Sequence, residues 1–337
     1  MSICFIQPKT HVSSSQNPLF KKRPLQLTHR PGAKSLSCES ECANSISATR
    51  LQVIHSRLFS LCLRVSCISP PKTQFWSCKV QHRVTGQVMA LKMNMLDSNR
   101  ANMLREVQLM NRLSHPNILR YLCVHEGQLH ALTEYINGGN LEQLLGSDVY
   151  LSWAVRLGLA LDIARGLHYL HSKGFFHRDL TSKNCLVRWE GDLCSAIVAD
   201  FGLAEKIPDC REDQDLAVVG SPYWMAPEML RGEVYNEKVD VFAYGIILCE
   251  IIARIQADPD IMPRTEDFGL DVPNFKQMVG DCPPDFLELA VSCSCLNVKI
   301  RPSFSQIIAE LEKRKAERML KDELAVKGEA SNVANRC

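Results

Sequence analysis

The chain lacks several patterns that would place it in a function class at once. Its 15 cysteines include no Cys-x-x-Cys pair, so no zinc ribbon or dithiol redox motif is indicated, and reduced thiols in an intracellular globular chain fit best. It has no Gly-x-x-x-x-Gly-Lys-Ser/Thr and no His-Glu-x-x-His, which argues against a P-loop ATP-binding protein and a zinc hydrolase. The net charge of +2 gives no reason to expect nucleic-acid binding.

Acidic residues are scarce in residues 1–75, where Glu39 and Glu41 stand against ten Lys and Arg. No apolar core follows Met1, as a signal peptide would require. Charged side chains interrupt the apolar residues 51–68, so we expect no membrane span. An organelle transit peptide would share this acid-poor, Ser-rich composition, but we favour a disordered extension over residues 1–75.

The stretch from His177 to Gly202 carries the strongest chemical signal. It begins with His-Arg-Asp-Leu-Thr-Ser-Lys-Asn and ends with Asp-Phe-Gly. Phosphoryl transfer needs a carboxylate at the attacking hydroxyl, an amide oxygen on Mg²⁺ and a second carboxylate between metal and phosphate. Asp179, Asn184 and Asp200 supply these groups in that order. Asp-Phe-Gly alone recurs by chance, but the combined pattern resembles the catalytic loop of the eukaryotic protein kinases.

A lysine and a glutamate upstream complete this pattern. Residues 79–84 and 87–92 predict two strands joined by a Thr-Gly turn, and the second strand ends in Met-Ala-Leu-Lys. This resembles the kinase Val-Ala-Ile-Lys, so Lys92 is expected to hold the α- and β-phosphates of ATP. Residues 99–113 predict a helix with Glu106 beside its apolar stripe, where it can pair with Lys92. Taken singly, Lys92 and Glu106 would be solvated side chains; together they favour the ion pair.

Two further strands are expected at residues 118–122 and 129–135. The resemblance implies that Thr133 lies at the back of the nucleotide pocket. It also implies that the segment after it, with Glu134 and Ile136, is the hinge whose backbone meets adenine. Asn137-Gly138-Gly139 can also be an ordinary turn, and the two interpretations are compatible.

The rest of the chain is mainly helical. Apolar periodicity predicts a helix from residue 151 to 174, a buried helix over residues 239–253 and a charged helix over residues 310–327. We therefore predict an α+β, two-lobed protein kinase fold. A small antiparallel β lobe plus one helix precedes a large, mainly helical lobe, with the domain over residues 76–312 and a charged helix and tail over residues 313–337.

Residues 200–228 are expected to form the activation segment. Ser221, between a glycine and a proline, is a predicted phosphorylation site whose phosphate would pair with Arg178. Alternatively, Ser221 only forms a turn. The resemblance further implies that Asp240 binds the backbone of the catalytic loop and that Arg301 pairs with Glu228.

The position of one cation and the sequence of three segments indicate which group of protein kinases the chain resembles. The common Ser/Thr kinases carry a lysine two residues after the catalytic aspartate; here Thr181 takes that place and the cation is Lys183, where tyrosine kinases have arginine. We expect Lys183 to lie near the transferring phosphate. Residues 179–187, 219–228 and 253–266 resemble the testis-specific protein kinases, relatives of the LIM kinases. This implies dual-specificity Ser/Thr and Tyr kinase activity with ATP and Mg²⁺ or Mn²⁺. It also implies that the substrate is actin-depolymerising factor/cofilin, whose phosphorylation would stabilise actin filaments.

One motif of the protein kinases, the Gly-rich loop, is absent from this sequence. Kinases lay a Gly-rich loop over the phosphates ahead of their lysine, but residues 70–77 hold no glycine. We therefore expect the first strand and this loop to be missing, and a catalytically weak or inactive kinase-like scaffold is the alternative function. Cytoplasm is the default location, with a nuclear pool as a second option, and the sequence gives no oligomeric state.

Overall fold

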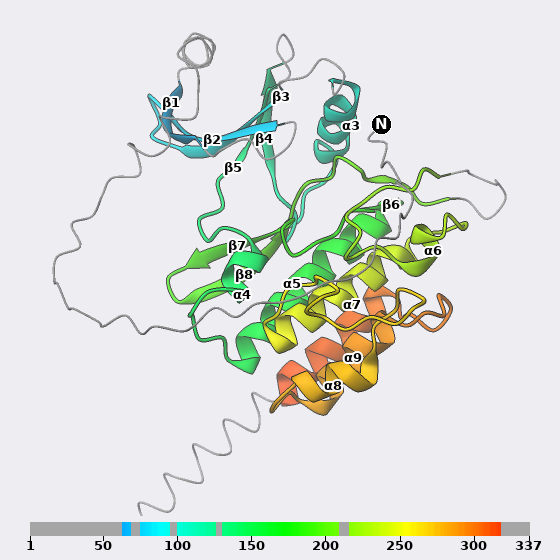
Figure 1. Cartoon of the computed structure of the whole chain (residues 1–337). Coiled ribbons are helices and arrows are strands. Elements are labelled where there is room, and N and C mark those ends of the chain that lie inside the picture. The colour runs from blue at the N-terminus through cyan, green and yellow to red at the C-terminus, as the bar shows by residue number, and fades with distance from the viewer. Residues whose placement is uncertain (1–62, 69–74, 95–99, 126–129, 209–215, 318–337) are drawn as a thin grey trace, which may run out of the picture.

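The computed structural model describes residues 63–68, 75–94, 100–125, 130–208 and 216–317. They form a small lobe, in which one helix lies beside an antiparallel sheet, and a larger, mainly helical lobe below it (Figure 1). This is the predicted α+β arrangement, and that prediction is confirmed.

The small lobe is a five-stranded sheet in the order β1-β2-β3-β5-β4, with all neighbours antiparallel. A hairpin turn at Gly86, whose φ of +71° suits glycine, joins β2 to β3. Because side chains alternate between faces, Leu91 is buried on one face while Ala90 and Lys92 lie on the other. The strands are β1 (Leu63–Ile68), β2 (Phe75–His82), β3 (Val88–Asn94), β4 (Tyr121–His125) and β5 (His130–Glu134).

The first strand corrects one expectation. We expected it to be missing, but β1 pairs with β2 inside the stretch assigned to the disordered extension, and Leu63 is buried in the sheet's core. The expectation rested on the missing glycines, yet a strand needs only residues that fit a half-buried pleated surface. The loop between these strands, residues 69–74, lies outside the described residues, as do residues 1–62.

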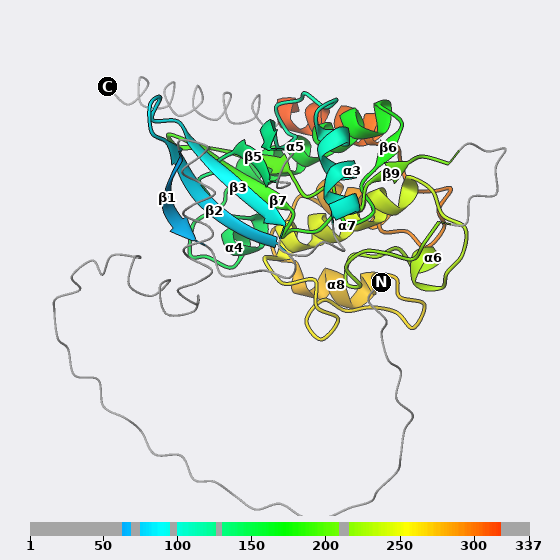
Figure 2. The same cartoon turned by 90° about the horizontal axis from the view of Figure 1, so that it is seen from above.

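Helix α3 (Arg100–Met110) lies beside the sheet, as the view from above shows (Figure 2). Its buried side chains Met103, Val107 and Met110 recur at helical spacing, which is the pattern that predicted it. Glu106 lies among them and is only 3% exposed. A carboxylate so deeply buried requires a partner.

The large lobe is built around α5 and α7. Ser152 caps α5 by accepting a hydrogen bond from the Val155 amide. Two antiparallel strand pairs, β6–β9 and the hairpin β7–β8, lie on the side facing the small lobe. The elements are α4 (Leu141–Leu145), α5 (Trp153–Ser172), β6 (Phe175–Phe176), β7 (Cys185–Glu190), β8 (Leu193–Val198), β9 (Glu205–Lys206), α6 (Pro227–Leu230), α7 (Lys238–Ala253), α8 (Val272–Met278), α9 (Pro284–Cys293) and a helix over residues 304–317.

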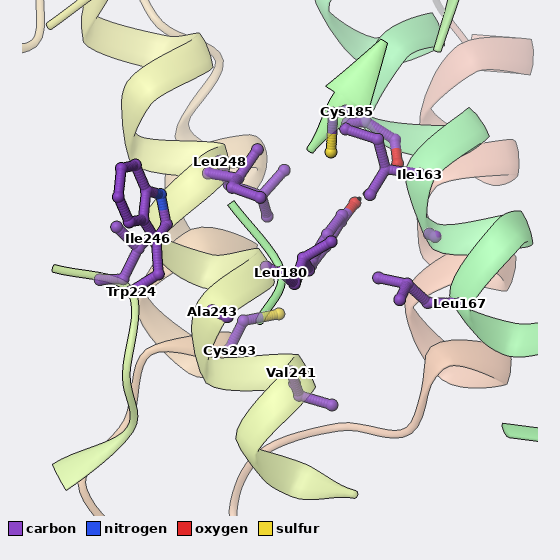
Figure 3. Packing of buried hydrophobic residues seen from close by; sticks show 14 of the residues in the cluster. Ile163, Leu167, Leu180, Cys185, Trp224, Val241, Ala243, Ile246, Leu248 and Cys293 are labelled. Carbon is purple, nitrogen blue, oxygen red and sulfur yellow. Dashed lines mark hydrogen bonds between the residues drawn. The ribbon is translucent and has the colours of Figure 1, made fainter. Parts of the chain in front are cut away.

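Helix α7 is buried along nearly its whole length, as its apolar sequence predicts. Figure 3 shows Leu180 lying between α5, which provides Ile163 and Leu167, and α7, which provides Val241 and Ala243. Burying one such aliphatic side chain contributes about 1.5–3 kcal/mol. Leu180 follows Asp179 directly, so this core fixes the position of the catalytic loop.

No helix within the described ranges is long and apolar enough to cross a membrane. Cys185, Cys249 and Cys293 are buried free thiols. Burial raises the pKa of the Cys293 thiol to about 12, so this thiol is protonated and unreactive at neutral pH.

Candidate active site

Three charged side chains meet where the small lobe faces the large one. The Lys92 ammonium, at the middle of β3, lies 3.0 Å from both carboxylate oxygens of Glu106 and 3.1 Å from Oδ1 of Asp200. The Tyr121 hydroxyl donates to Glu106 Oε1 at 2.8 Å, so two donors fix this carboxylate. The expected Lys92–Glu106 ion pair is present, and Asp200 joins it.

The electrostatics keep Lys92 and Asp200 charged at neutral pH. Burial alone would lower the pKa of Lys92, but the carboxylates of Asp200 and Glu106 raise it above its usual value. Burial alone would raise the pKa of Asp200, but the Lys92 ammonium lowers it below its ordinary range. A fixed cation therefore lies beside a fixed anion, which suits a phosphate and a metal cation side by side.

The Asp240 carboxylate binds the backbone of the catalytic loop, as expected. This residue, only 1% exposed at the start of α7, accepts hydrogen bonds from the amides of His177 and Arg178 at 2.7 and 2.9 Å. His171 Nε2 lies 2.8 Å from the same carboxylate. Arg178 takes a φ of +66°, an uncommon conformation that these bonds hold in place.

Asp179 and Asn184 lie on this loop beside one another. The Asn184 side-chain amide donates to the Asp179 carbonyl at 2.9 Å, so its side-chain oxygen is the atom left for a cation. Within the described ranges, no group of three or more His, Cys, Asp or Glu residues forms a metal site of its own. Mg²⁺ is usually held by one or two protein oxygens plus substrate phosphates, so Asn184 and Asp200 fit such an ion.

Ser221 lies closer to the catalytic loop than the sequence indicates. Its hydroxyl donates to Asp179 Oδ1 at 2.8 Å. Burial raises the pKa of Asp179 above its usual value, while this hydrogen bond opposes the rise. The Arg178 guanidinium instead donates to the carbonyl of Leu203 at 2.7 Å and to the Tyr235 hydroxyl at 3.3 Å. The pairing of a Ser221 phosphate with Arg178 stays a prediction.

Lys183 lies beside Glu142 and Trp224, and its predicted place near the transferring phosphate stays a prediction. Its ammonium lies 3.5 Å from Glu142 Oε1 and 5.7 Å from the Trp224 ring centroid. Its side chain is 57% exposed, so this weak pair leaves it able to move. The structure thus does not bring Lys183 together with Lys92 and Asp200, because spacing along a loop does not set the direction of a long, flexible side chain.

The predicted hinge is tied to the large lobe. Asn137 exchanges two hydrogen bonds with the Trp189 backbone, at 2.8 and 2.9 Å, and Gly138 N donates to the Val187 carbonyl at 2.8 Å. The Glu134 carboxylate pairs with Arg188 at 2.7 Å. The Glu134 side chain is therefore engaged in this pair, and its backbone amide donates to the Arg120 carbonyl at 3.0 Å.

The other two predicted pocket residues lie at the same end of the sheet. Thr133 is 5% exposed, and its hydroxyl donates to the Glu134 carbonyl at 3.1 Å. Ile136 is 9% exposed, one residue beyond Tyr135. Their place in the nucleotide pocket stays a prediction.

A buried carboxylate that sequence reasoning missed links the catalytic loop to the activation segment. Glu250 of α7 accepts from the Ser182 hydroxyl and from Trp224 Nε1, both at 2.8 Å. Burial raises the pKa of Glu250 to about 7, and these two bonds only partly oppose the rise. No local pattern marks it, because its apolar neighbours on α7 resemble any buried helix.

A cavity of about 470 Å³ separates α3 from the segment after Asp200. Arg105 and Glu106 of α3 line one side, and Phe201 and Glu205 line the other. Leu109 and Met110 of α3 nevertheless belong to the same buried core as Phe201. The contacts of Glu106 with Lys92 and Tyr121 hold the carboxylate in the site.

Comparison with known protein families agrees with this geometry. Residues 73–311 match the family described as protein tyrosine and serine/threonine kinase. The chain belongs to this family, and members of it generally use ATP and Mg²⁺.

The kinase domain is similar to two named kinases. It is 70% identical over 237 residues to dual specificity testis-specific protein kinase 2 of Homo sapiens, covering 69% of this chain and 42% of that protein. It is 71% identical over 232 residues to the Mus musculus protein of that name, covering 68% and 41%. It is 69% identical over 240 residues to human dual specificity testis-specific protein kinase 1, covering 69% and 38%. The predicted resemblance to testis-specific kinases is confirmed, and the chain spans less than half the length of these relatives.

Proposed function

We propose that this chain is a dual-specificity protein kinase that transfers the γ-phosphate of ATP to Ser, Thr and Tyr hydroxyls of proteins. The observation that carries the proposal is the position of Lys92, within 3.1 Å of both Glu106 and Asp200. The dual specificity in the names of the similar kinases supports the range of hydroxyls.

In this proposal Lys92 holds the α- and β-phosphates, and Glu106 holds Lys92. Asn184 and Asp200 hold Mg²⁺, with Mn²⁺ as an alternative, and the metal neutralises charge on the phosphates when bound. The hinge backbone at Glu134 and Ile136 contacts adenine, and Thr133 closes the back of the pocket.

Asp179 is the proposed base. It accepts the proton of the attacking hydroxyl, and its raised pKa makes it a better proton acceptor than an ordinary aspartate. The Ser221 hydroxyl, which donates to Asp179 Oδ1 at 2.8 Å, supports this role because it occupies the place proposed for a substrate hydroxyl. Lys183 moves from Glu142 toward the transferring phosphate, since its exposed ion pair is weak.

Ser221 is the proposed regulatory phosphorylation site. A phosphate there would lie beside the Asp179 carboxylate, and repulsion between the two anions would move the segment away. Phosphorylation would thus free Asp179 for a substrate hydroxyl.

For the substrate we propose actin-depolymerising factor/cofilin, phosphorylated at its N-terminal Ser, with an effect on actin organisation. The proposal rests on the resemblance of residues 179–187 and 219–228 to testis-specific kinases.

We propose the cytoplasm, with a nuclear pool, as the location.

The test is phosphate transfer by purified protein with labelled Mg-ATP and cofilin. The expected result is label on cofilin from the wild type and none from Asp179→Ala. Cofilin with its N-terminal Ser replaced by Ala should remain unlabelled. Absence of label with the wild type, or equal label with Asp179→Ala, would defeat the proposal.

The second candidate is a kinase-like scaffold that binds partners but holds ATP poorly. The absence of glycine from residues 70–77 favours it, because the backbone amides of a Gly-rich loop would otherwise cradle the phosphates. Thermal-shift titration with Mg-ATP separates the two, since a ligand that binds the folded state must raise Tm. A concentration-dependent rise rules against the scaffold.

A further inference from the structure

Lys79 occupies an unusual place for a cation. It pairs with Ala90 across β2 and β3, and Ala90 pairs with Thr133 across β3 and β5. Directly paired residues share a face, and Ala90 shares its face with Lys92 two residues later. The neighbours of Lys79 on β2, Cys78 and Val80, are buried in the core on the opposite face. Lys79 therefore lies on the face of the sheet that carries the active site.

The Lys79 side chain spans this face as far as the hinge. Its ammonium lies 4.5 Å from the centroid of the Tyr135 ring, directly after β5. Neighbouring strands are about 4.8 Å apart and β3 separates β2 from β5, so the Lys79 and Tyr135 side chains together span β3. Between them on this face lies Ala90, which carries only a methyl group. In the described part of the chain no acid pairs with Lys79, so the aromatic ring is its electrostatic partner.

This cation–π contact lies where the proposed function puts the purine. Glu134 and Ile136, on either side of Tyr135, are the hinge residues assigned to adenine, and Thr133 is the assigned back of the pocket. A purine entering between the sheet and the large lobe would meet the apolar stem of Lys79 over Ala90. It could reach the hinge backbone only after the ammonium leaves the ring.

We propose that Lys79 and Tyr135 form a gate over the purine end of the nucleotide site and thereby limit affinity for adenine nucleotides. This inference rests on the proposed function. The gate acts on the purine, so it affects adenosine and Mg-ATP alike, whereas Lys92 and Asp200 act on the phosphates and metal.

The test is a double-mutant cycle of ligand affinity, measured by calorimetry with adenosine and with Mg-ATP. Lys79→Ala removes the cation, and Tyr135→Leu removes the ring. Each should lower Kd about two- to fivefold, the range for an exposed cation–π pair, and the double variant should show no further gain. Lys79→Arg keeps the pair and should bind like the wild type. Apo melting temperatures of all variants check the fold.

Three results would overturn the gate. The first is an unchanged or weaker affinity of Lys79→Ala for adenosine. The second is a change with Mg-ATP only, which would place Lys79 on the phosphates. The third is full additivity of the two single variants. If Mg-ATP binds the wild type but the cycle shows no coupling, only the gate fails. If neither ligand binds any variant, the gate and the proposed function fail together.

Discussion

At the scale of single residues, the Glu106 carboxylate determines whether Lys92 can serve a phosphate. It is 3% exposed and receives hydrogen bonds from Lys92 and Tyr121. Glu106→Gln keeps the shape but removes the charge. Since a hydrogen bond to a charged group contributes about 1.5–3 kcal/mol, kcat/KM should fall about tenfold or more.

Glu142→Gln is the matched control for this variant. Its carboxylate pairs with the exposed Lys183, so kcat/KM should change far less. Steady-state kinetics on both variants provide the comparison. Equal losses in the two variants would contradict the assigned role of Glu106.

The pKa of Asp179 gives a second prediction at this scale. Activity that depends on the ionised carboxylate is lost as the pH falls. Because the pKa of Asp179 is raised, this loss begins at a higher pH than it would for an ordinary aspartate. The Ser221 hydroxyl lowers this pKa, so Ser221→Ala should raise it further. The acidic limb of the kcat/KM–pH profile should move to higher pH. A shift to lower pH would mean that Ser221 does not stabilise the ionised form.

The site residues that could be predicted from the sequence are those that belong to short motifs with a fixed spacing. Lys92, Asp179, Asn184 and Asp200 each belong to a short motif whose residue types the chemistry demands. Tyr121 does not, since it reaches Glu106 from 15 positions away in the chain. Such partners become visible only in the folded structure.

At the scale of elements, the hinge is fixed by side-chain contacts to β7. Asn137 contributes two hydrogen bonds to the Trp189 backbone, whereas Arg188 and Glu134 form a part-exposed ion pair. Asn137→Ala should therefore lower the free energy of unfolding by about 1–3 kcal/mol, because its backbone partners lose their bonds. Arg188→Gln should cost about 1 kcal/mol or less. Urea denaturation measures both, and a larger loss for Arg188→Gln would reverse the assigned order.

Element prediction succeeded where periodicity was strong and failed where a missing motif was overvalued. The buried helix α7 and helix α3 follow directly from their apolar spacing. Strand β1 was expected to be absent because glycines were, although Leu63 begins a stretch that can pair with β2. The direction of the Lys183 side chain could not be predicted, since it depends on Glu142 and Trp224.

At the scale of the whole molecule, Glu250 connects α7, the catalytic loop and the activation segment through Ser182 and Trp224. Burial raises its pKa from 4.5 to about 7, with Glu142 acting in the same direction and Arg264 against it. The folded state thus binds more protons than the unfolded state in this window. Its stabilising contribution is present below pH ~4.5 and is lost as pH rises to about 7.

Glu250→Gln does not titrate, so its stability relative to the wild type should rise across that window. The gain should reach at most about 3 kcal/mol, the free energy that the pKa difference represents. Urea denaturation at several pH values measures it, with the exposed Glu190→Gln as control. A relative stability that is flat with pH would mean that Glu250 keeps an ordinary pKa.

The central claim is that Asn184 and Asp200 hold a metal that binds together with the nucleotide opposite Lys92. Calorimetric titration of ATP with and without Mg²⁺ tests it most directly, on the wild type and on Asp200→Asn. The account predicts that Mg²⁺ tightens ATP binding to the wild type and that Asp200→Asn loses this gain. ATP binding by the wild type that is indifferent to Mg²⁺, or an unchanged gain in Asp200→Asn, would contradict it.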